Sequence, residues 1–492
     1  MIKTALISFL TNSINTRSLS SYLKKNGHEV TCFFCVSDFN RKNLNALMQM
    51  ISDGDFGLVG VSLVTDDYKS AVLLTREIKQ KLEVPVIWGG AHVNIRPEEC
   101  LQHADMICLG EGEDALLDLV RNIGEQASLK NTTIKNIWFK TESGIVRNDL
   151  RSLEENLDKY PFPDFDLASQ YVMYDDGFEK LSEKHFGSEY SIMTSRGCPY
   201  SCDYCYNSYR KSQYRGLGTY LRRRSVEHVI AELSHAKQLF RNLKKINFWD
   251  DSFVARSIDE FQQFKEMYTK QINLPFFALI EPMVFQYDKI KLLKECGLSG
   301  LQVGVQSGSE RVNREIYGRK ISNEKIIEVA QLINSLGINV VYDLIFNNPY
   351  ETKADIMETI CLLQKFPRPF LLQGYNLIFY PGTAMTEKAL HDRIISDNKD
   401  ADKFSTIQST INSPIARRGR GEVSSRFYTI NYDSREKEYL NSVLTLLAYR
   451  FVPNIIVRYF YSIETPLRRQ LLKLFLSLYT TASVIKNEVI RR

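Results

Sequence analysis

Short apolar runs alternate with amphipathic segments along residues 1–135, and each change of period marks the change from a strand to a helix. The predicted strands are 3–10, a strand that begins after Gly27, 56–64, 84–90 and 105–113. The predicted helices are 16–27, 68–82 and 114–125. This alternation predicts an α/β domain, a parallel sheet with helices on both faces, in which ligands bind beyond the carboxyl ends of the strands.

A second strand–helix series begins near residue 186. Its predicted strands are 190–197, 245–253, 275–281, 300–308, 339–347 and 371–381. Helical patterns such as 225–240 and 322–337 fill the gaps. Six such units predict a full or partial β/α (TIM) barrel, whose chemistry gathers at the carboxyl ends of the strands.

Two further regions lack this alternation. Residues 136–185 contain the proline-rich stretch "KYPFPDFDL" and are predicted to be a surface connector. The last part of the chain is predicted to be helical, with amphipathic, basic segments at 440–462 and 467–485. The predicted domains are therefore 1–135, a linker at 136–185, a barrel at 186–400 and a helical region at 401–492.

The bulk composition narrows the class of protein. A net charge of +5 over 492 residues, with 44% hydrophobic and 25% charged residues, is typical of a globular protein and does not favour a nucleic-acid partner. The nine cysteines are an odd number, and the first residues lack a signal-peptide pattern. A reducing cytoplasm is the expected location. No apolar run reaches the 18–20 residues, roughly, that cross a bilayer.

Three cysteines lie close together in "TSRGCPYSCDYCYNS", directly after the first strand of the second series. Cys198, Cys202 and Cys205 have the spacing CxxxCxxC. A structural zinc ion takes four ligands, but the next cysteine is Cys296 and no histidine is near. Three thiolates on one loop favour a [4Fe–4S] cluster with one open iron, and structural zinc is the alternative.

The stretch "RGCPYSCDYCYN" resembles the cluster motif of radical S-adenosylmethionine (radical SAM) enzymes, in which an aromatic residue, here Tyr204, precedes the last cysteine. The resemblance implies that Cys198, Cys202 and Cys205 hold the cluster and that its open iron binds SAM. It also implies cleavage of SAM to a 5′-deoxyadenosyl radical, with an electron from an external flavodoxin- or ferredoxin-type donor.

Further segments resemble the SAM contacts of the same family. "FWDDSF" carries Asp250 and Asp251, which the resemblance places at the SAM amino group, with a solvated turn as the alternative. "GVQSGSE" resembles the fourth-strand segment and supplies Gln306 and Ser307. Arg319 of "YGRK" follows, and a guanidinium suits the SAM carboxylate because it binds carboxylates through two parallel hydrogen bonds.

Two later strands also resemble this family. "DLIFNNPYET" is similar to a fifth-strand segment usually written GLPGET, but Asn347, Asn348 and Tyr350 depart from that pattern. "FYPGT" matches a sixth-strand ending.

The first domain resembles the Rossmann-like cobalamin-binding module found ahead of radical SAM barrels, through "YLKKNGHEV", "VGVSLV", "WGGAHVNIRPEE" and "CLGEGED". Like that module, it lacks a DxHxxG motif. Plain turn glycines are the alternative interpretation. The predicted cobalamin contacts are Gly89, Gly90, His92, Gly110, Glu111 and Gly112.

The resemblance as a whole implies a cobalamin-dependent radical SAM enzyme that transfers a methyl group to an unactivated carbon or phosphorus of a small-molecule or natural-product substrate. A non-methylating radical reaction on the same scaffold (cyclisation, ring contraction or oxidation) and a non-catalytic iron–sulfur scaffold are the alternatives. Methyl transfer would yield both S-adenosylhomocysteine and 5′-deoxyadenosine.

The remaining cysteines and the carboxyl-terminal helices receive structural interpretations. Cys32 and Cys35 form a CxxC, but they lie inside an apolar run and are expected to be buried strand residues. Packing is also expected for four other cysteines, Cys100, Cys108, Cys296 and Cys361. The carboxyl-terminal helices either cover the barrel mouth or contact a membrane surface or lipid.

Overall fold

The computed structural model describes residues 2–36, 39–125, 133–174, 177–396, 435–447, 452–462, 465–472 and 474–476. The chain divides into two compact units. The first unit comprises residues 1–197 and 210–250, and the second comprises residues 198–209 and 251–492.

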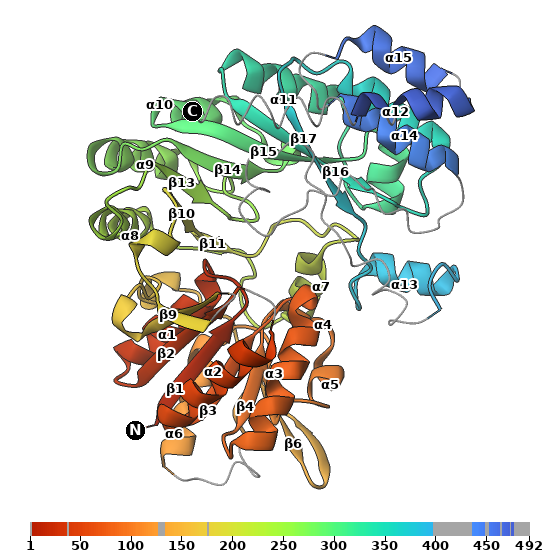
Figure 1. Ribbon diagram of the computed structural model, residues 1–492. Coiled ribbons are helices and arrows are strands. Elements are labelled where there is room, and N and C mark those ends of the chain that lie inside the picture. Colours follow the sequence, from red (N-terminus) through yellow and green to blue (C-terminus); the bar gives the residue numbers. More distant parts are fainter. Residues whose placement is uncertain are drawn as a thin grey trace. The chain divides into compact units, whose positions relative to one another are not determined.

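A nine-stranded sheet forms the centre of the first unit (Figure 1). Its order is β7-β6-β5-β4-β3-β1-β2-β8-β9. The strand bounds are β1 Lys3–Ser8, β2 Glu29–Cys35, β3 Phe56–Ser62, β4 Val86–Gly89, β5 Met106–Cys108, β6 Ile137–Thr141, β7 Gly144–Arg147, β8 Gln170–Tyr174 and β9 Gly177–Lys180. The first five strands are parallel. β2 and β3 lie on opposite sides of β1, so the order of the strands reverses at β1. Such a reversal of strand order is where open α/β sheets bind ligands.

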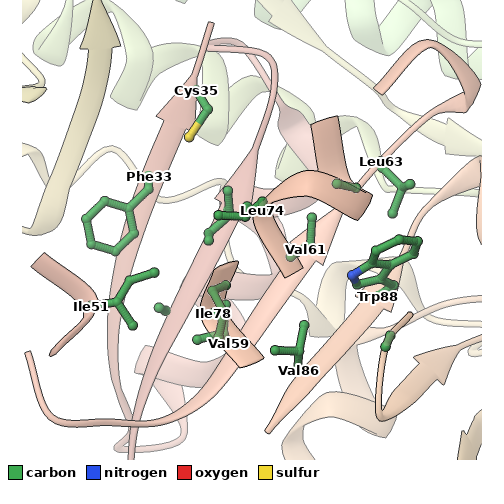
Figure 2. Close-up of a cluster of buried hydrophobic side chains, with 14 of the residues drawn as sticks. Phe33, Cys35, Ile51, Val59, Val61, Leu63, Leu74, Ile78, Val86 and Trp88 are labelled. Carbon is green, nitrogen blue, oxygen red and sulfur yellow. The ribbon is translucent and has the colours of Figure 1, made fainter. Parts of the chain in front are cut away.

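Helices cover both faces of this sheet, as the alternating pattern predicts. Their bounds are α1 Ile14–Lys25, α2 Arg41–Asp53, α3 Tyr68–Lys81, α4 Ala91–Ile95, α5 Pro97–Cys100 and α6 Glu113–Gly124. One apolar core joins α2 and α3 to the sheet and contains Phe33, Val61, Leu74 and Trp88 (Figure 2). The Trp88 indole N–H donates to Thr75 Oγ1 at 2.8 Å, so this buried donor is satisfied. A second core on the opposite face joins α1 and α6.

The structure differs from the predicted connector at residues 136–185. Four of the nine strands, β6 to β9, come from this segment. β6 pairs antiparallel with β5, and β8 pairs parallel with β2, so both edges of the sheet are built from it. These strands are short and form the two outer parts of the sheet, where half-exposed positions weaken the apolar pattern.

The burial predicted for the six cysteines outside the three-cysteine loop is confirmed except at one position. Cys32 and Cys35 are both buried, but they lie in opposite cores of the first unit, so they do not form a pair. Cys100, Cys108 and Cys296 are buried as predicted. The packing prediction is wrong for Cys361, which is exposed on the outer side of α12 (Lys353–Leu363).

The remainder of the first unit leads into the cysteine loop. β10 (Glu189–Ile192) pairs parallel with β13 (Lys245–Phe248), and α8 (Val226–Leu239) connects them. A two-residue strand, β11 (Ser195–Arg196), pairs antiparallel with β12 (Arg222–Arg223) just ahead of the first cysteine of the loop. α7 (Tyr206–Gln213) follows the last cysteine.

The second unit contains the parallel strands β14 Phe276–Ile280, β15 Leu298–Gln306, β16 Asn339–Phe346 and β17 Leu371–Asn376, adjacent in that order. Each agrees with a predicted strand to within a few residues. Helices alternate with them (Figure 1). Their bounds are α9 Ile258–Gln271, α10 Tyr287–Glu295, α11 Asn323–Ser335, α12 Lys353–Leu363 and α13 Ala384–His391.

Two carboxyl-terminal helices lie within the described residues. α14 (Arg435–Leu446) packs against α12, and α15 (Asn454–Ser462) packs against α14, so they extend the helical layer of the second unit. Residues 401–434 and the residues after 476 of the predicted helical region lie outside the described residues. Among the described helices, none combines the length and the apolar character that crossing a membrane requires.

Candidate functional site

The cysteine loop of the second unit is a chain of tight turns. The Cys205 N–H donates to the Cys202 carbonyl at 3.0 Å, and the Ser208 hydroxyl donates to the same carbonyl at 2.6 Å. The loop is anchored by Asp203, whose N–H donates to the Tyr317 carbonyl at 3.0 Å. Cys198, Cys202 and Cys205 are all half-buried. The three thiols are thus held on one short, ordered loop.

Backbone and side-chain donors surround the thiols. The N–H groups of Tyr200 and Asn207 donate to Cys198 and Cys205, and the Tyr204 hydroxyl donates to Cys202. Desolvation nevertheless raises the pKa of Cys198 to about 12 and that of Cys205 to about 11. The free thiols are therefore protonated at neutral pH, and a metal that binds them must displace the protons.

A buried ion pair lies beside the loop. The Arg319 side chain has no exposed surface, and it donates to Glu281 at 2.6 Å and to the Val305 and Gly304 carbonyls. Desolvation raises the pKa of Cys202, and the charge of Arg319 opposes this by favouring the thiolate. The structure thus places the predicted SAM-carboxylate ligand Arg319 beside Cys202, with both terminal nitrogens engaged by protein groups and its buried Nε without a hydrogen-bond partner among the described residues.

The predicted acidic pair separates into two environments. Asp250 is completely buried in the first unit, where one of its oxygens accepts from the Thr194 N–H and hydroxyl and from the Ser195 hydroxyl at 2.5 to 3.0 Å. Asp251 lies in the second unit, where Asn207 donates a hydrogen bond to it and its charge raises the pKa of Cys198 and Cys205. Of the two, the structure brings Asp251 close to the cysteines.

Gln306 and Ser307 lie at the carboxyl end of β15. The pairing of β15 with β16 shifts register between Gly304 and Gln306, and Gln306 has a φ of 69°. Such bulges and left-handed residues re-aim side chains beside functional sites. Ser307 is buried, and its hydroxyl donates to Glu351 at 3.1 Å.

Glu351 is a carboxyl group to which the sequence patterns gave no role. Burial raises its pKa from the ordinary 4.5 to about 8, although Ser307 donates to it. The folded protein thus holds a proton here between about pH 4.5 and pH 8 that the unfolded chain releases. Stability must therefore fall as the pH rises through this window.

We expect Glu351→Gln to remove this pH dependence, since the amide keeps an oxygen for Ser307 and carries no charge. The wild type should lose on the order of 3 kcal/mol of unfolding free energy between pH 6 and pH 9 relative to this variant. Denaturant unfolding of both proteins at the two pH values measures the difference. Parallel curves for the two proteins would contradict the assignment.

A cavity of about 290 Å³ opens at the carboxyl edge of the nine-stranded sheet in the first unit. Glycines from three neighbouring strand ends, those of β3, β4 and β5, line it together with apolar side chains of α1 and α6. Gly89, Gly90, Gly110, Glu111 and Gly112 all line it, as the sequence predicted for a ligand site. The segment before the cysteine loop contributes Met193, Ser195 and Arg196, which the sequence patterns did not indicate.

Two of these glycines occupy positions closed to other residues. Gly90 has a φ of 106°, and a Cβ there would clash with the Leu63 carbonyl. Gly110 has a φ of 77°, and a Cβ there would clash with the Tyr214 hydroxyl. Only glycine adopts such backbone conformations without strain, so both residues shape the edge of the cavity.

His92 differs from its predicted place because it is buried and does not belong to the lining of this cavity. Its Nδ1 lies 3.2 Å from Thr65 Oγ1, and its ring packs on Tyr68. Burial lowers the pKa of His92 to about 4, so the ring is neutral at physiological pH. Histidines in apolar surroundings are often core residues, and this one supports the loop after β3.

Glu111 is held between two arginines. Arg222 donates to it at 2.5 and 3.1 Å, and Arg196 lies 3.0 Å away. Burial alone raises the pKa of Glu111, but the two guanidinium groups lower it below its usual range. Arg196 also contacts Glu113 at 2.5 Å. This network ties the glycine loop at the end of β5 to the β11–β12 pair that precedes Cys198.

Comparison with protein-family models gives two matches. Residues 4–120 match the B12 binding domain, and residues 192–363 match the Radical SAM superfamily. The first range contains the glycine-lined edge of the cavity, and the second contains the cysteine loop. This chain joins a B12-binding domain to a radical SAM domain.

Two named methyltransferases resemble most of this chain in sequence. The chain is 29% identical over 357 residues to "Uncharacterized methyltransferase PH0819" of Pyrococcus horikoshii, an alignment that covers 71% of this chain and 72% of the relative. It is 23% identical over 379 residues to bacteriochlorophyllide d C-8(2)-methyltransferase of Chlorobaculum tepidum, covering 73% and 74%.

Among solved structures, the radical SAM methyltransferase TsrM of Kitasatospora setae, with tryptophan and a SAM analogue bound, superposes with a TM-score of 0.66. It is 17% identical, and the superposition covers 80% of this chain and 76% of TsrM. The cobalamin-dependent radical SAM enzyme OxsB superposes with a TM-score of 0.60 at 20% identity, covering 82% of this chain and 56% of OxsB. These likenesses show the fold.

The two domain matches imply the cofactors of the chain, a [4Fe–4S] cluster with SAM for the radical SAM domain and a cobalamin for the B12-binding domain. The cysteine loop supplies three thiols. A [4Fe–4S] cluster with one open iron takes three thiolates, each on a different iron. A structural zinc ion takes four ligands.

The B12-binding domain fits its cofactor through the cavity. Its lining is largely glycine and apolar side chains, as in most cofactor sites, and it opens where parallel sheets bind ligands. The cavity would receive one part of the cofactor, with Gly89, Gly90 and Gly110 at its edge. No histidine belongs to this lining.

Several contributors to these sites were missed in the sequence. Glu281 had a usable signal, because it directly follows β14 at a carboxyl strand end. Arg196 and Arg222 had no such signal in the sequence, because their partners Glu111 and Glu113 are about 85 to 110 residues away in the chain. Pairings of this kind become visible only in the folded chain.

Proposed function

We propose that this chain is a cobalamin-dependent radical SAM methyltransferase that acts on an unactivated carbon or phosphorus of a small-molecule substrate. The observation that carries the proposal is the presence, in one chain, of the three-cysteine loop and of the glycine-lined cavity of a B12-binding domain. The names of two similar proteins as methyltransferases support methyl transfer over other radical reactions.

The cofactors, when bound, supply a 5′-deoxyadenosyl radical and a transferable methyl group. The protein positions them and excludes water. Cys198, Cys202 and Cys205 would hold the cluster. Arg319 stabilises negative charge at Cys202, while Asp251, Gln306 and Ser307 are the proposed SAM contacts. The glycines at the cavity edge let the backbone approach cobalamin closely.

An external one-electron donor of flavodoxin or ferredoxin type would serve the cluster. Contact with a lipid surface would involve α15, which exposes Ile455 and Tyr459. Its amphipathic character is the feature that favours such contact.

The product pair from SAM tests the proposed reaction. Anaerobic enzyme with reduced cobalamin and a small-molecule extract of the source cells receives SAM labelled with deuterium in its methyl group. Methyl transfer predicts extract-dependent formation of both 5′-deoxyadenosine and S-adenosylhomocysteine, with a product heavier by one labelled methyl group. Extract-dependent 5′-deoxyadenosine without S-adenosylhomocysteine would show a non-methylating radical reaction instead.

A further inference from the structure

Four polar side chains lie together on one face of three adjacent strands in the second unit. Gln302 is on β15, Asp343 is on β16, and Gln373 and Tyr375 are on β17. Asp343 is in register with Gln373, and the residues alternate with apolar ones along each strand. Because successive side chains point to opposite faces, the four share one face of the sheet.

Hydrogen bonds join these side chains into one network. Gln302 Nε2 donates to Asp343 Oδ2 at 2.7 Å and to the Tyr375 hydroxyl at 3.2 Å. Gln373 Nε2 also donates to the Tyr375 hydroxyl. The hydroxyl oxygen therefore accepts from two amides, and its own proton remains available to an acceptor.

One hydrogen-bond acceptor of the network receives no hydrogen bond from the described part of the chain. Asp343 Oδ1 is buried and has no hydrogen-bond partner among the described residues. A buried carboxyl oxygen without a partner costs stability, and a ligand N–H that donates to it would remove this cost. Burial raises the pKa of Asp343 to about 7, to which the charge of Glu281 also contributes.

The network faces the same side as the cluster loop. The Glu281 charge that raises the pKa of Asp343 also raises the pKa of Cys198 and Cys205. Gly304 lies in register with Asp343, and a Cβ there would meet Glu281 at 2.9 Å. The polar face of β15 to β17 is therefore the face toward the reacting groups.

The opposite face of the same strands is apolar, as expected for residues that only pack. Leu301, Val303, Val305, Leu344 and Phe346 are buried there and apolar. A barrel interior that only needed filling would carry similar branched side chains. Four polar residues, one of them with an unpaired oxygen, would stabilise a core less than apolar side chains do.

We propose that Gln302, Asp343, Gln373 and Tyr375 form the substrate-recognition site and that Asp343 Oδ1 accepts an N–H of the substrate while the Tyr375 hydroxyl donates to a neighbouring acceptor. The inference rests on the proposed radical SAM activity. The substrate class is a nitrogen-bearing small molecule, either a neutral amide or a cationic amine, and both share the N–H donor.

The test compares variants of the holoenzyme in extract-stimulated formation of 5′-deoxyadenosine. The probe is deuteromethyl-SAM with the small-molecule extract of the source cells. Asp343→Leu should lower the extract-dependent rate by roughly tenfold or more, because it removes the acceptor. The slow SAM cleavage without extract and the iron content should stay at the wild-type values.

A second substitution distinguishes the two kinds of nitrogen. Asp343→Asn keeps an oxygen acceptor but loses the negative charge. This variant should lower the extract-dependent rate only about two- to fivefold if the substrate is a neutral amide. It should lower the rate by roughly tenfold or more if the substrate is a cationic amine. Tyr375→Phe should also lower the extract-dependent rate, since it removes the donor.

Tyr342→Phe is the matched control. Tyr342 is next to Asp343 on the same strand but points to the opposite face, where its hydroxyl is buried. This variant should keep the full extract-dependent rate. If Asp343→Leu and Tyr375→Phe also keep that rate, or if the extract fails to stimulate the wild type, the inference is overturned.

The outcomes separate this inference from the proposed function. If the extract stimulates 5′-deoxyadenosine in a manner that depends on Asp343 but no methyl group is transferred, the recognition site stands and methyl transfer does not. If a methyl group is transferred equally by wild type and Asp343→Leu, methyl transfer stands and the recognition site does not.

Discussion

We expect Cys202→Ala to abolish the formation of 5′-deoxyadenosine. The Cys202 thiol is held by Tyr204 and faces Arg319, and it is one of only three thiols on the cluster loop. A cluster with one open iron needs all three thiolates, so the loss of one leaves no stable cluster to reduce SAM. Chromatographic assay of anaerobic, reconstituted enzyme under reducing conditions should show only the background of a protein-free sample.

The control for this substitution is Cys361→Ala. Cys361 is exposed on α12 and belongs to neither site, so its loss should leave the iron content and SAM cleavage unchanged. Measurable 5′-deoxyadenosine from Cys202→Ala would contradict the assignment of the cluster. An equal loss in both variants would indicate general damage from the substitution of a cysteine.

We expect Gly89→Leu to prevent cobalamin binding without loss of the cluster. Gly89 lines the cavity with an ordinary backbone conformation, and a Cβ there has Cys108 Cβ at 3.9 Å as its nearest neighbour. The backbone therefore tolerates a side chain, and the leucine would occupy the volume that the cofactor needs. Bound cobalt should fall by roughly tenfold or more, a loss of about 1.4 kcal/mol or more in affinity.

Gly124→Leu is the matched control for this variant. Gly124 ends α6 away from the cavity, and a Cβ there meets nothing within 4 Å. It should retain the wild-type cobalt and iron. Gly89→Leu with wild-type cobalt would show that cobalamin binds elsewhere. A loss of iron together with cobalt would show that the substitution unfolds the protein instead of blocking one site.

The strand–helix series was predictable because both units bury parallel strands, whose continuous apolar runs stand out against amphipathic helices. Every predicted strand of the two series corresponds to an observed one. The segment 136–185 was not predictable, because β6 to β9 form two short hairpins that join the sheet through more distant strands, β6 through β5 and β8 through β2. Their register depends on the completed sheet.

The candidate sites show the same difference between local patterns, which the sequence reveals, and long-range contacts, which it does not. A local spacing such as CxxxCxxC could be found directly, and so could glycines at strand ends. Side-chain partners that are far apart in the sequence could not be found in this way. Arg319 illustrates this, because its guanidinium is engaged by Glu281, which lies 38 residues earlier in the chain. Asp343 is another case, since its surroundings arise only when three strands come into register.

The most direct test of the central claim is the metal content of the isolated holoprotein. The protein is produced anaerobically with cobalamin supplied, reconstituted with iron and sulfide, desalted, and analysed for cobalt and iron per chain. Two occupied sites predict about one cobalt and about four irons. Four irons without cobalt would contradict the role assigned to the first domain, and zinc in place of iron would contradict the role assigned to the cysteine loop.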